Sequence, residues 1–150
     1  MKKMNKKGFT LIELLAIIVI LAIIAVITVP IILNIIDEAR KGAEKNSVIG
    51  YGKAVELAYT QYQYEQSLGS GTNSHAGAST DDRTTGKVIK IGTDLYLKVD
   101  FDGDHVVCTS AAISNDGKVT LGGCQVVNGS GTSYTYSEGK AIEGTVQQGS

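Results

Sequence analysis

Side chains that could do chemistry are few in this 150-residue chain. Asp100, Asp102 and Asp104 surround one predicted turn, with Asp94 nearby, and calcium takes oxygen ligands of this kind. Their spacing does not match an EF-hand loop. The tips of hairpin turns also often carry acidic residues simply because they are exposed to solvent. We therefore keep calcium at this turn as a minor alternative, and predict no metal and no cofactor.

The other polar residues give little support for catalysis or zinc binding. Asp104, His105 and Ser110 offer the residue types of a hydrolase triad, but no strained serine turn and no oxyanion hole accompany them. Two cysteines and two histidines are too scattered for the short ligand spacing of a zinc site. No phosphate-binding loop and no dinucleotide-binding glycine turn occurs. The sequence predicts a protein that is not an enzyme.

Charge is distributed unevenly along the chain. Four of the fourteen Lys and Arg residues lie within the first seven positions. Beyond residue 8, ten basic side chains stand against fifteen acidic ones, a formal net charge of −5. Because phosphate groups are bound through clusters of Lys and Arg, nucleic acid is not expected as a general partner.

An uncharged, largely apolar segment extends from Leu14 to Leu33. Twenty helical residues cover about 30 Å, the thickness of a bilayer's hydrocarbon core. No small-residue cleavage site follows Leu33, as a cleaved secretory signal peptide would require. Short Lys-rich flanks stay in the cytoplasm, so we expect a single-pass helix with its N-terminus inside and the bulk of the chain outside.

A second pattern lies at the start of this segment. Lys6-Lys7-Gly8-Phe9-Thr10-Leu11-Ile12-Glu13-Leu14-Leu15 has basic residues, then Gly8 and Phe9, and Glu13 just before the apolar run. It resembles the processing motif of type IV prepilins and pseudopilins: a basic leader, Gly before the cut, Phe after it and Glu at the fifth mature position. Pro30 stands at the twenty-second mature position, also as in many pilins. The resemblance implies that a prepilin peptidase cleaves between Gly8 and Phe9 and methylates the new amine of Phe9.

Glu13 and Pro30 are the residues expected to act in assembly. The cut leaves a charged amine at Phe9, and Glu13 of a neighbouring subunit is its natural partner in an apolar filament core. Pro30 lacks the N–H that would bond the Val26 carbonyl, so we expect the helix to bend or unwind near it in a filament. The implied partners are the prepilin peptidase, other pilin subunits, the cytoplasmic membrane and the pilus assembly machinery.

Helical periodicity continues beyond this segment to about Gln66. Apolar residues recur at three- and four-residue spacing over 36–62, whereas charged residues, Glu44 and Glu56 among them, lie mainly on other faces. The interior glycines are predicted points of local bending: Gly42, Gly50 and Gly52. The segment over 67–86 is rich in Gly, Ser and Thr and reads as an exposed loop.

Short segments with strand character follow the loop, at 87–91, 95–101, 105–113, 119–127 and 133–136. Asp102-Gly103 and Asn115-Asp116-Gly117 are the predicted hairpin turns. Such local connections favour an antiparallel arrangement packed on the second half of the helix. The predicted fold class is α+β and type IV pilin-like: a long N-terminal helix, with a membrane half and an amphipathic half, packed on a small antiparallel β-sheet.

The predicted organisation follows from these elements and from the resemblance. Residues 1–8 form a leader peptide, 9–36 the transmembrane and filament-core half of the helix, and 37–150 an extracytoplasmic domain with helix 37–66, loop 67–86 and sheet 87–146. The implied function is that of a structural subunit of a type IV pilus-like filament, in the cytoplasmic membrane before assembly and at the cell surface afterwards. Adhesion, motility, DNA uptake and secretion all stay open. The alternative is a monomeric single-pass membrane protein that displays a small β-rich binding domain.

Cys108 and Cys124 are predicted to form a disulfide. If Asn115-Asp116-Gly117 is a three-residue loop with Gly117 in the left-handed conformation, the numbers of opposed residues sum to 232, as those of the two cysteines do. Opposed residues lie close enough for the bond, and an extracytoplasmic location permits oxidation. Two reduced buried cysteines are the alternative, and a bulge at Gly122-Gly123 would shift the register by one.

One modification signal accompanies these features. Asn128-Gly129-Ser130 has the acceptor pattern for N-glycosylation, a pattern that also arises often by chance.

Overall fold

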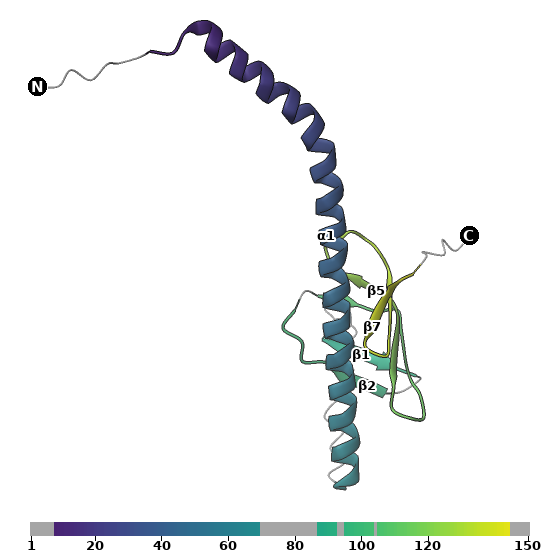
Figure 1. The fold of residues 1–150 in the computed structure, drawn as a ribbon. Helices are drawn as coiled ribbons and strands as arrows, with labels where there is room; N and C mark the ends of the chain where they lie inside the picture. The colour runs from purple at the N-terminus through teal and green to yellow at the C-terminus, as the bar shows by residue number, and fades with distance from the viewer. Residues whose placement is uncertain (1–7, 70–86, 93–94, 104, 145–150) are drawn as a thin grey trace, which may run out of the picture. The chain divides into compact units, whose positions relative to one another are not determined.

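The computed structural model describes residues 8–69, 87–92, 95–103 and 105–144. These residues form helix α1 (Leu11–Ser67) and seven strands: β1 (Val88–Ile91), β2 (Leu95–Lys98), β3 (Val106–Val107), β4 (Ser110–Ile113), β5 (Val119–Val126), β6 (Tyr134–Ser137) and β7 (Lys140–Glu143) (Figure 1). The chain divides into two compact units, Met1–Ala39 and Arg40–Ser150, and α1 contributes one half to each.

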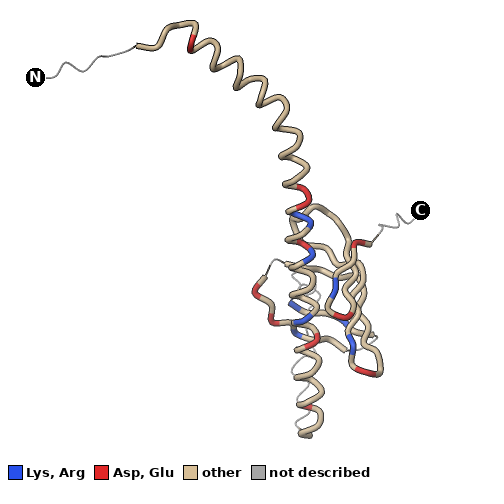
Figure 2. Tube along the Cα trace, viewed as in Figure 1, with Lys and Arg blue, Asp and Glu red and all other residues tan. Residues whose placement is uncertain are grey.

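The first unit is the apolar half of α1. The sequence between Glu13 and Asp37 contains no charged residue, and the corresponding stretch of the helix is tan throughout in Figure 2. Large hydrophobic side chains from Phe9 to Ile36 are 47% to 82% exposed, and by length and composition this helix can cross a membrane. The α-helix is unbroken through Pro30 in the single chain, so the bend expected in a filament stays a prediction.

In the second unit, the amphipathic half of α1 packs on antiparallel strands. Val48, Tyr51 and Val55 recur at helical spacing and are at most 2% exposed. They share one core with buried residues of the strands and of the β2–β3 connection: Ile89, Ile91, Leu97, Val99, Val106, Val119, Leu121, Cys124, Tyr134 and Tyr136. The predicted α+β class, with a long helix packed on antiparallel strands, is confirmed.

Gly50 and Gly52 serve close packing rather than the predicted bending. The helix is continuous through both. A Cβ added to Gly52 would overlap the ring of Tyr136, and one added to Gly50 would lie 3.0 Å from Phe101 Cε2. The two glycines therefore let aromatic rings approach the helix backbone.

The strands form two sheets where a single one was expected. β1 pairs with β2, whereas β3 and β4 both pair with one edge of β5, followed by β6 and β7. The prediction of a hairpin turn at Asp102-Gly103 is wrong, because β2 and β3 belong to different sheets. Core packing explains why the chain passes from one sheet to the other between β2 and β3. In this connection, Val99 is 3% exposed, and Phe101 contacts Tyr51 edge-on with ring centroids 5.8 Å apart.

Strand β7 is absent from the sequence-based prediction. It follows a two-residue turn in which Glu138 and Gly139 both have positive φ, 51° and 76°, with Ser137 paired to Lys140. Turns of this type favour Asn or Asp at the first position. Because Glu138 stands there instead, the sequence lacks the usual Asn-Gly or Asp-Gly pattern that predicts a hairpin. The strand predicted over 105–113 is also interrupted, at Cys108 and Thr109, which separates β3 from β4.

The β4–β5 hairpin has the predicted loop and register. Gly117 has a φ of 81° and donates its N–H to the Ser114 carbonyl over 2.9 Å. Opposed residue numbers sum to 232 from the Ile113–Val119 pair to the Val106–Val126 pair. The bulge lies on the other side of β5, where the register with β6 shifts between Leu121 and Cys124.

Candidate functional site

A capping box opens α1 at the predicted processing motif. The backbone N–H and the hydroxyl of Thr10 donate to Glu13 Oε2 over 2.9 and 2.8 Å, and Glu13 N donates to Thr10 Oγ1 over 3.4 Å. This pair satisfies two of the N–H groups that the first turn leaves unpaired. Thr10 is not among the predicted functional residues, although Thr-x-x-Glu before an apolar run is the known signal for such a cap.

The two residues flanking the predicted cut precede the helix. Gly8 and Phe9 lie in irregular backbone, Phe9 is 81% exposed, and a Cβ added to Gly8 would meet nothing within 4 Å. The peptide bond between them is therefore open to approach. Residues 1–7 of the predicted leader lie outside the described residues.

The predicted disulfide between Cys108 and Cys124 is present. Their Cα atoms lie 3.9 Å apart, somewhat closer than the about 4.5 Å of directly opposed residues in antiparallel strands. Cys124 is fully buried and Cys108 is half-buried. The bond holds the interruption between β3 and β4 against β5.

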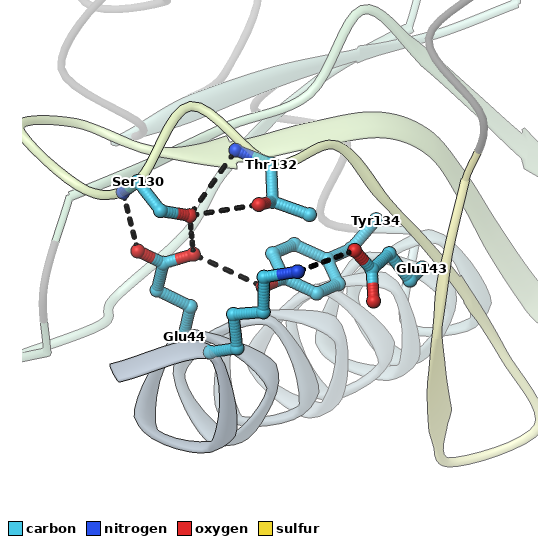
Figure 3. A network of polar contacts seen from close by, with 6 residues as sticks. Glu44, Ser130, Thr132, Tyr134 and Glu143 are labelled. Carbon is cyan, nitrogen blue, oxygen red and sulfur yellow. Dashed lines mark hydrogen bonds and ion pairs between the residues drawn. The ribbon is translucent and has the colours of Figure 1, made fainter. Parts of the chain in front are cut away.

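Glu44 is buried, contrary to the prediction that it lies on the polar face of the helix. It is 5% exposed and joins α1 to the segment that precedes β6 (Figure 3). Ser130 N donates to Oε1 over 2.5 Å, while Ser130 Oγ and the Tyr134 hydroxyl donate to Oε2 over 2.6 and 3.0 Å. A Cβ on Gly129 would lie 2.7 Å from Oε1, so a glycine there leaves room for the carboxylate.

Two further polar links connect the helix and the second sheet. Lys41 Nζ lies 3.1 Å from Glu143 Oε1 on β7, and the Tyr136 hydroxyl donates to Glu56 Oε1 over 2.9 Å. The Lys41–Glu143 pair is exposed enough to add little stability. Glu44 is therefore the principal polar anchor between helix and sheet.

Hydrogen bonds keep the Glu44 carboxylate ionised. Burial opposes the charge, but the bonds from Ser130 and Tyr134, together with the charge of Arg40, outweigh burial and lower the pKa of Glu44. Burial and the bond to Glu44 raise the pKa of Tyr134 to about 12. The phenol therefore keeps the proton that it donates to the carboxylate.

The lowered pKa of Glu44 predicts a loss of stability in acid. Since the folded pKa lies below the ordinary value of 4.5, the stabilisation from Glu44 is complete above that value and is lost as the pH falls through the folded pKa. We expect the difference in unfolding free energy between wild type and Glu44→Gln to be constant near neutral pH and to shrink below about pH 4.5. Denaturant titrations of both proteins at several pH values, followed by tyrosine near-UV circular dichroism, measure this difference. Parallel pH profiles would contradict an ionised Glu44 anchor.

Those of the other candidate residues that the structure describes are not brought together into a site. Asp94 and Asp104 lie outside the described residues, which leaves calcium and the triad untested. Within the described ranges, no group of three or more His, Cys, Asp or Glu is placed to hold a metal ion. His105 and Ser110 line different cavities. Asn128 is exposed with a φ of 63°, whereas the Ser130 hydroxyl of the acceptor pattern is bonded to Glu44.

The fold and the start of the helix together define a class of protein. A long apolar helix that begins just after Gly8, and whose second half packs on antiparallel strands, is consistent with a type IV pilin-like α+β fold. The family model of the prokaryotic N-terminal methylation motif matches residues 3–29. The chain therefore carries the prepilin-type cleavage and methylation motif, which belongs to structural proteins and, with the apolar helix, indicates membrane anchoring. Neither the curated proteins nor the solved structures gave a significant match to the chain.

Proposed function

We propose that this chain is a structural subunit, either a pilin or a pseudopilin, of a type IV pilus-like filament. A prepilin peptidase cuts between Gly8 and Phe9 and methylates the new amine. Residues 1–8 are then the leader, 9–36 the half of the helix that lies first in the membrane and later in the filament core, and 37–150 the extracytoplasmic domain. The observation that carries the proposal is the methylation motif at 3–29, continuous with an apolar helix.

The capping geometry supports the assembly role proposed for Glu13. Both hydrogen bonds from Thr10 fall on Oε2, and no bond to Oε1 is found among the described residues. A carboxylate accepts about four hydrogen bonds through its two oxygens. Glu13 can therefore cap its own helix and accept the Phe9 amine of a neighbouring subunit at the same time.

The exposed apolar half of α1 supports burial against lipid first and other subunits later. A contiguous apolar surface of this extent is not stable in water and marks an interaction surface. The hydrogen bonds of Glu44 to Ser130 and Tyr134, and of Glu56 to Tyr136, then fix the amphipathic half of the helix to β6 and the segment before it. The extracytoplasmic domain is thereby carried along with the helix into the filament.

A cryo-electron microscopy map of sheared surface filaments tests the proposal. We expect the helix of this chain in the filament core, with its hydrogen-bond ladder opened between Val26 and Pro30, where Pro30 already lacks a donor. A straight unbroken helix in the filament would contradict the role of Pro30. Filaments that lack the chain, with all of it in the membrane fraction as monomer, would favour the single-pass binding protein instead.

A further inference from the structure

The two residues of the disulfide differ in their surroundings. Cys124 is 0% exposed, lies inside β5 and is opposed by Tyr134 of β6. Cys108 is half-buried and lies at the break between β3 and β4, where the backbone leaves the strand geometry. One cysteine is thus enclosed by the sheet, and the other sits at a gap in its edge.

A cavity of about 370 Å³ lies beside Cys108. It is lined by residues 108–111, by residues 88–90 of β1, and by Gly92 and Tyr51. Cys124 does not line this cavity. Liquid water occupies about 30 Å³ per molecule, so the cavity has room for a small organic thiol next to Cys108.

The lining of the cavity favours an anion. Among the described residues that line the cavity, Lys90 is the charged one, and its Nζ lies 5.5 Å from the centroid of the Tyr96 ring. Burial raises the pKa of Tyr51 to about 12, so its phenol is neutral near pH 7 and contributes no negative charge. The attacking species in disulfide exchange is a thiolate, and a nearby cation stabilises it.

We propose that Cys108 Sγ is the atom attacked in thiol–disulfide exchange, both when the bond to Cys124 opens and when it closes again. The reaction partner is a small thiol in the adjacent cavity. The thiolate attacks Cys108 Sγ from the side away from Cys124, and a new S–S bond forms while the bond between Cys108 and Cys124 breaks. The electron pair stays on Cys124 Sγ, which takes up a proton from solvent. In the reverse direction, the Cys124 thiolate attacks Cys108 Sγ of the mixed disulfide and displaces the small thiolate, which closes the native bond.

Mapping the mixed disulfide tests this direction of attack. The full-length protein in detergent is exposed briefly to 2-mercaptoethanesulfonate, quenched with acid, and then alkylated with N-ethylmaleimide in denaturant. Peptide mass spectrometry should find the sulfonate on Cys108 and the maleimide on Cys124, in roughly tenfold excess over the opposite arrangement. The sulfonate on Cys124, equal labelling of both, or exchange only at the rate at which near-UV circular dichroism is lost would each overturn the proposal.

A charge-matched pair of reagents tests the cavity as the route of entry. The rate of exchange with anionic 2-mercaptoethanesulfonate is divided by the rate with cationic cysteamine, each corrected for its thiolate fraction. We expect this ratio to fall severalfold in Lys90→Gln and to stay unchanged in Lys118→Gln, a lysine that pairs with Glu138 away from the cavity. An unchanged ratio in Lys90→Gln would overturn the assigned route.

Discussion

Replacing Glu13 by alanine is expected to abolish filament assembly while the membrane helix still inserts and the sheets still fold. In the proposed filament core, the charged amine of Phe9 would have no water to solvate it. Removing the partner of a buried charge costs roughly 3–5 kcal/mol, and about 1.4 kcal/mol is a factor of ten in affinity. The yield of sheared filaments should therefore fall by roughly 100-fold or more. Membrane insertion should persist, because the acidic side chain is itself costly in lipid.

A glutamine variant separates amine pairing from helix capping. Glu13→Gln keeps an oxygen that can accept from the N–H and the hydroxyl of Thr10, but it has no charge to pair with the amine. We expect it to assemble as poorly as Glu13→Ala. Thr10→Val removes the capping hydroxyl and costs only about 1 kcal/mol, so it should retain most filaments. Near-normal filament yield from Glu13→Gln would assign Glu13 to capping alone.

Replacing Glu44 by alanine should destabilise the domain clearly more than replacing an exposed acidic residue of the same helix. The change leaves the N–H of Ser130 and the hydroxyl of Tyr134 without their acceptor, whereas the Ser130 hydroxyl can still donate to Thr132 Oγ1 over 2.8 Å. The Tyr134 hydroxyl is buried, and a buried donor left unpaired costs about 1–3 kcal/mol. Ser130 is exposed, so water can accept from its N–H at a lower cost. We expect a loss of about 2 kcal/mol and a fall in melting temperature on the order of 5–10 °C.

The matched control is Glu38→Ala, which removes an exposed acidic side chain from the same helix. Surface substitutions of this kind usually change stability by less than about 0.5 kcal/mol. Thermal unfolding followed by tyrosine near-UV circular dichroism compares the two, since Tyr51, Tyr134 and Tyr136 are buried. Equal melting temperatures for Glu44→Ala and Glu38→Ala would contradict the anchor.

Features encoded by local patterns could be predicted from the sequence. The apolar run and the helical periodicity over 36–62 predicted the helix, which is observed as Leu11–Ser67. The residues from Gly8 to Glu13 predicted the methylation motif, whose family model matches residues 3–29. The pairing of Cys108 with Cys124 depended only on the turn at Asn115-Asp116-Gly117 and the register that such a loop imposes. Residues close in sequence decide all of these features.

Features that depend on contacts between residues far apart in the sequence could not be predicted from local patterns. Nothing near Glu44 shows that Ser130 and Tyr134, 86 and 90 positions later, supply its hydrogen bonds, so its charge alone placed it on the polar face. The glycine at position 52 looked like a flexible point because the ring of Tyr136 that it accommodates comes from β6. The separation into two sheets depends in the same way on the burial of Val99 and Phe101 in the shared core.

The N-terminus of the mature chain tests the central claim, processing as a prepilin, most directly. Protein purified from its native membrane or filaments is cleaved after glutamate, and the N-terminal peptide that ends at Glu13 is analysed by mass spectrometry. The account predicts a peptide over residues 9–13 that begins at Phe9 and carries one methyl group on its amine. A dominant peptide that still contains Lys7 and Gly8 would contradict it.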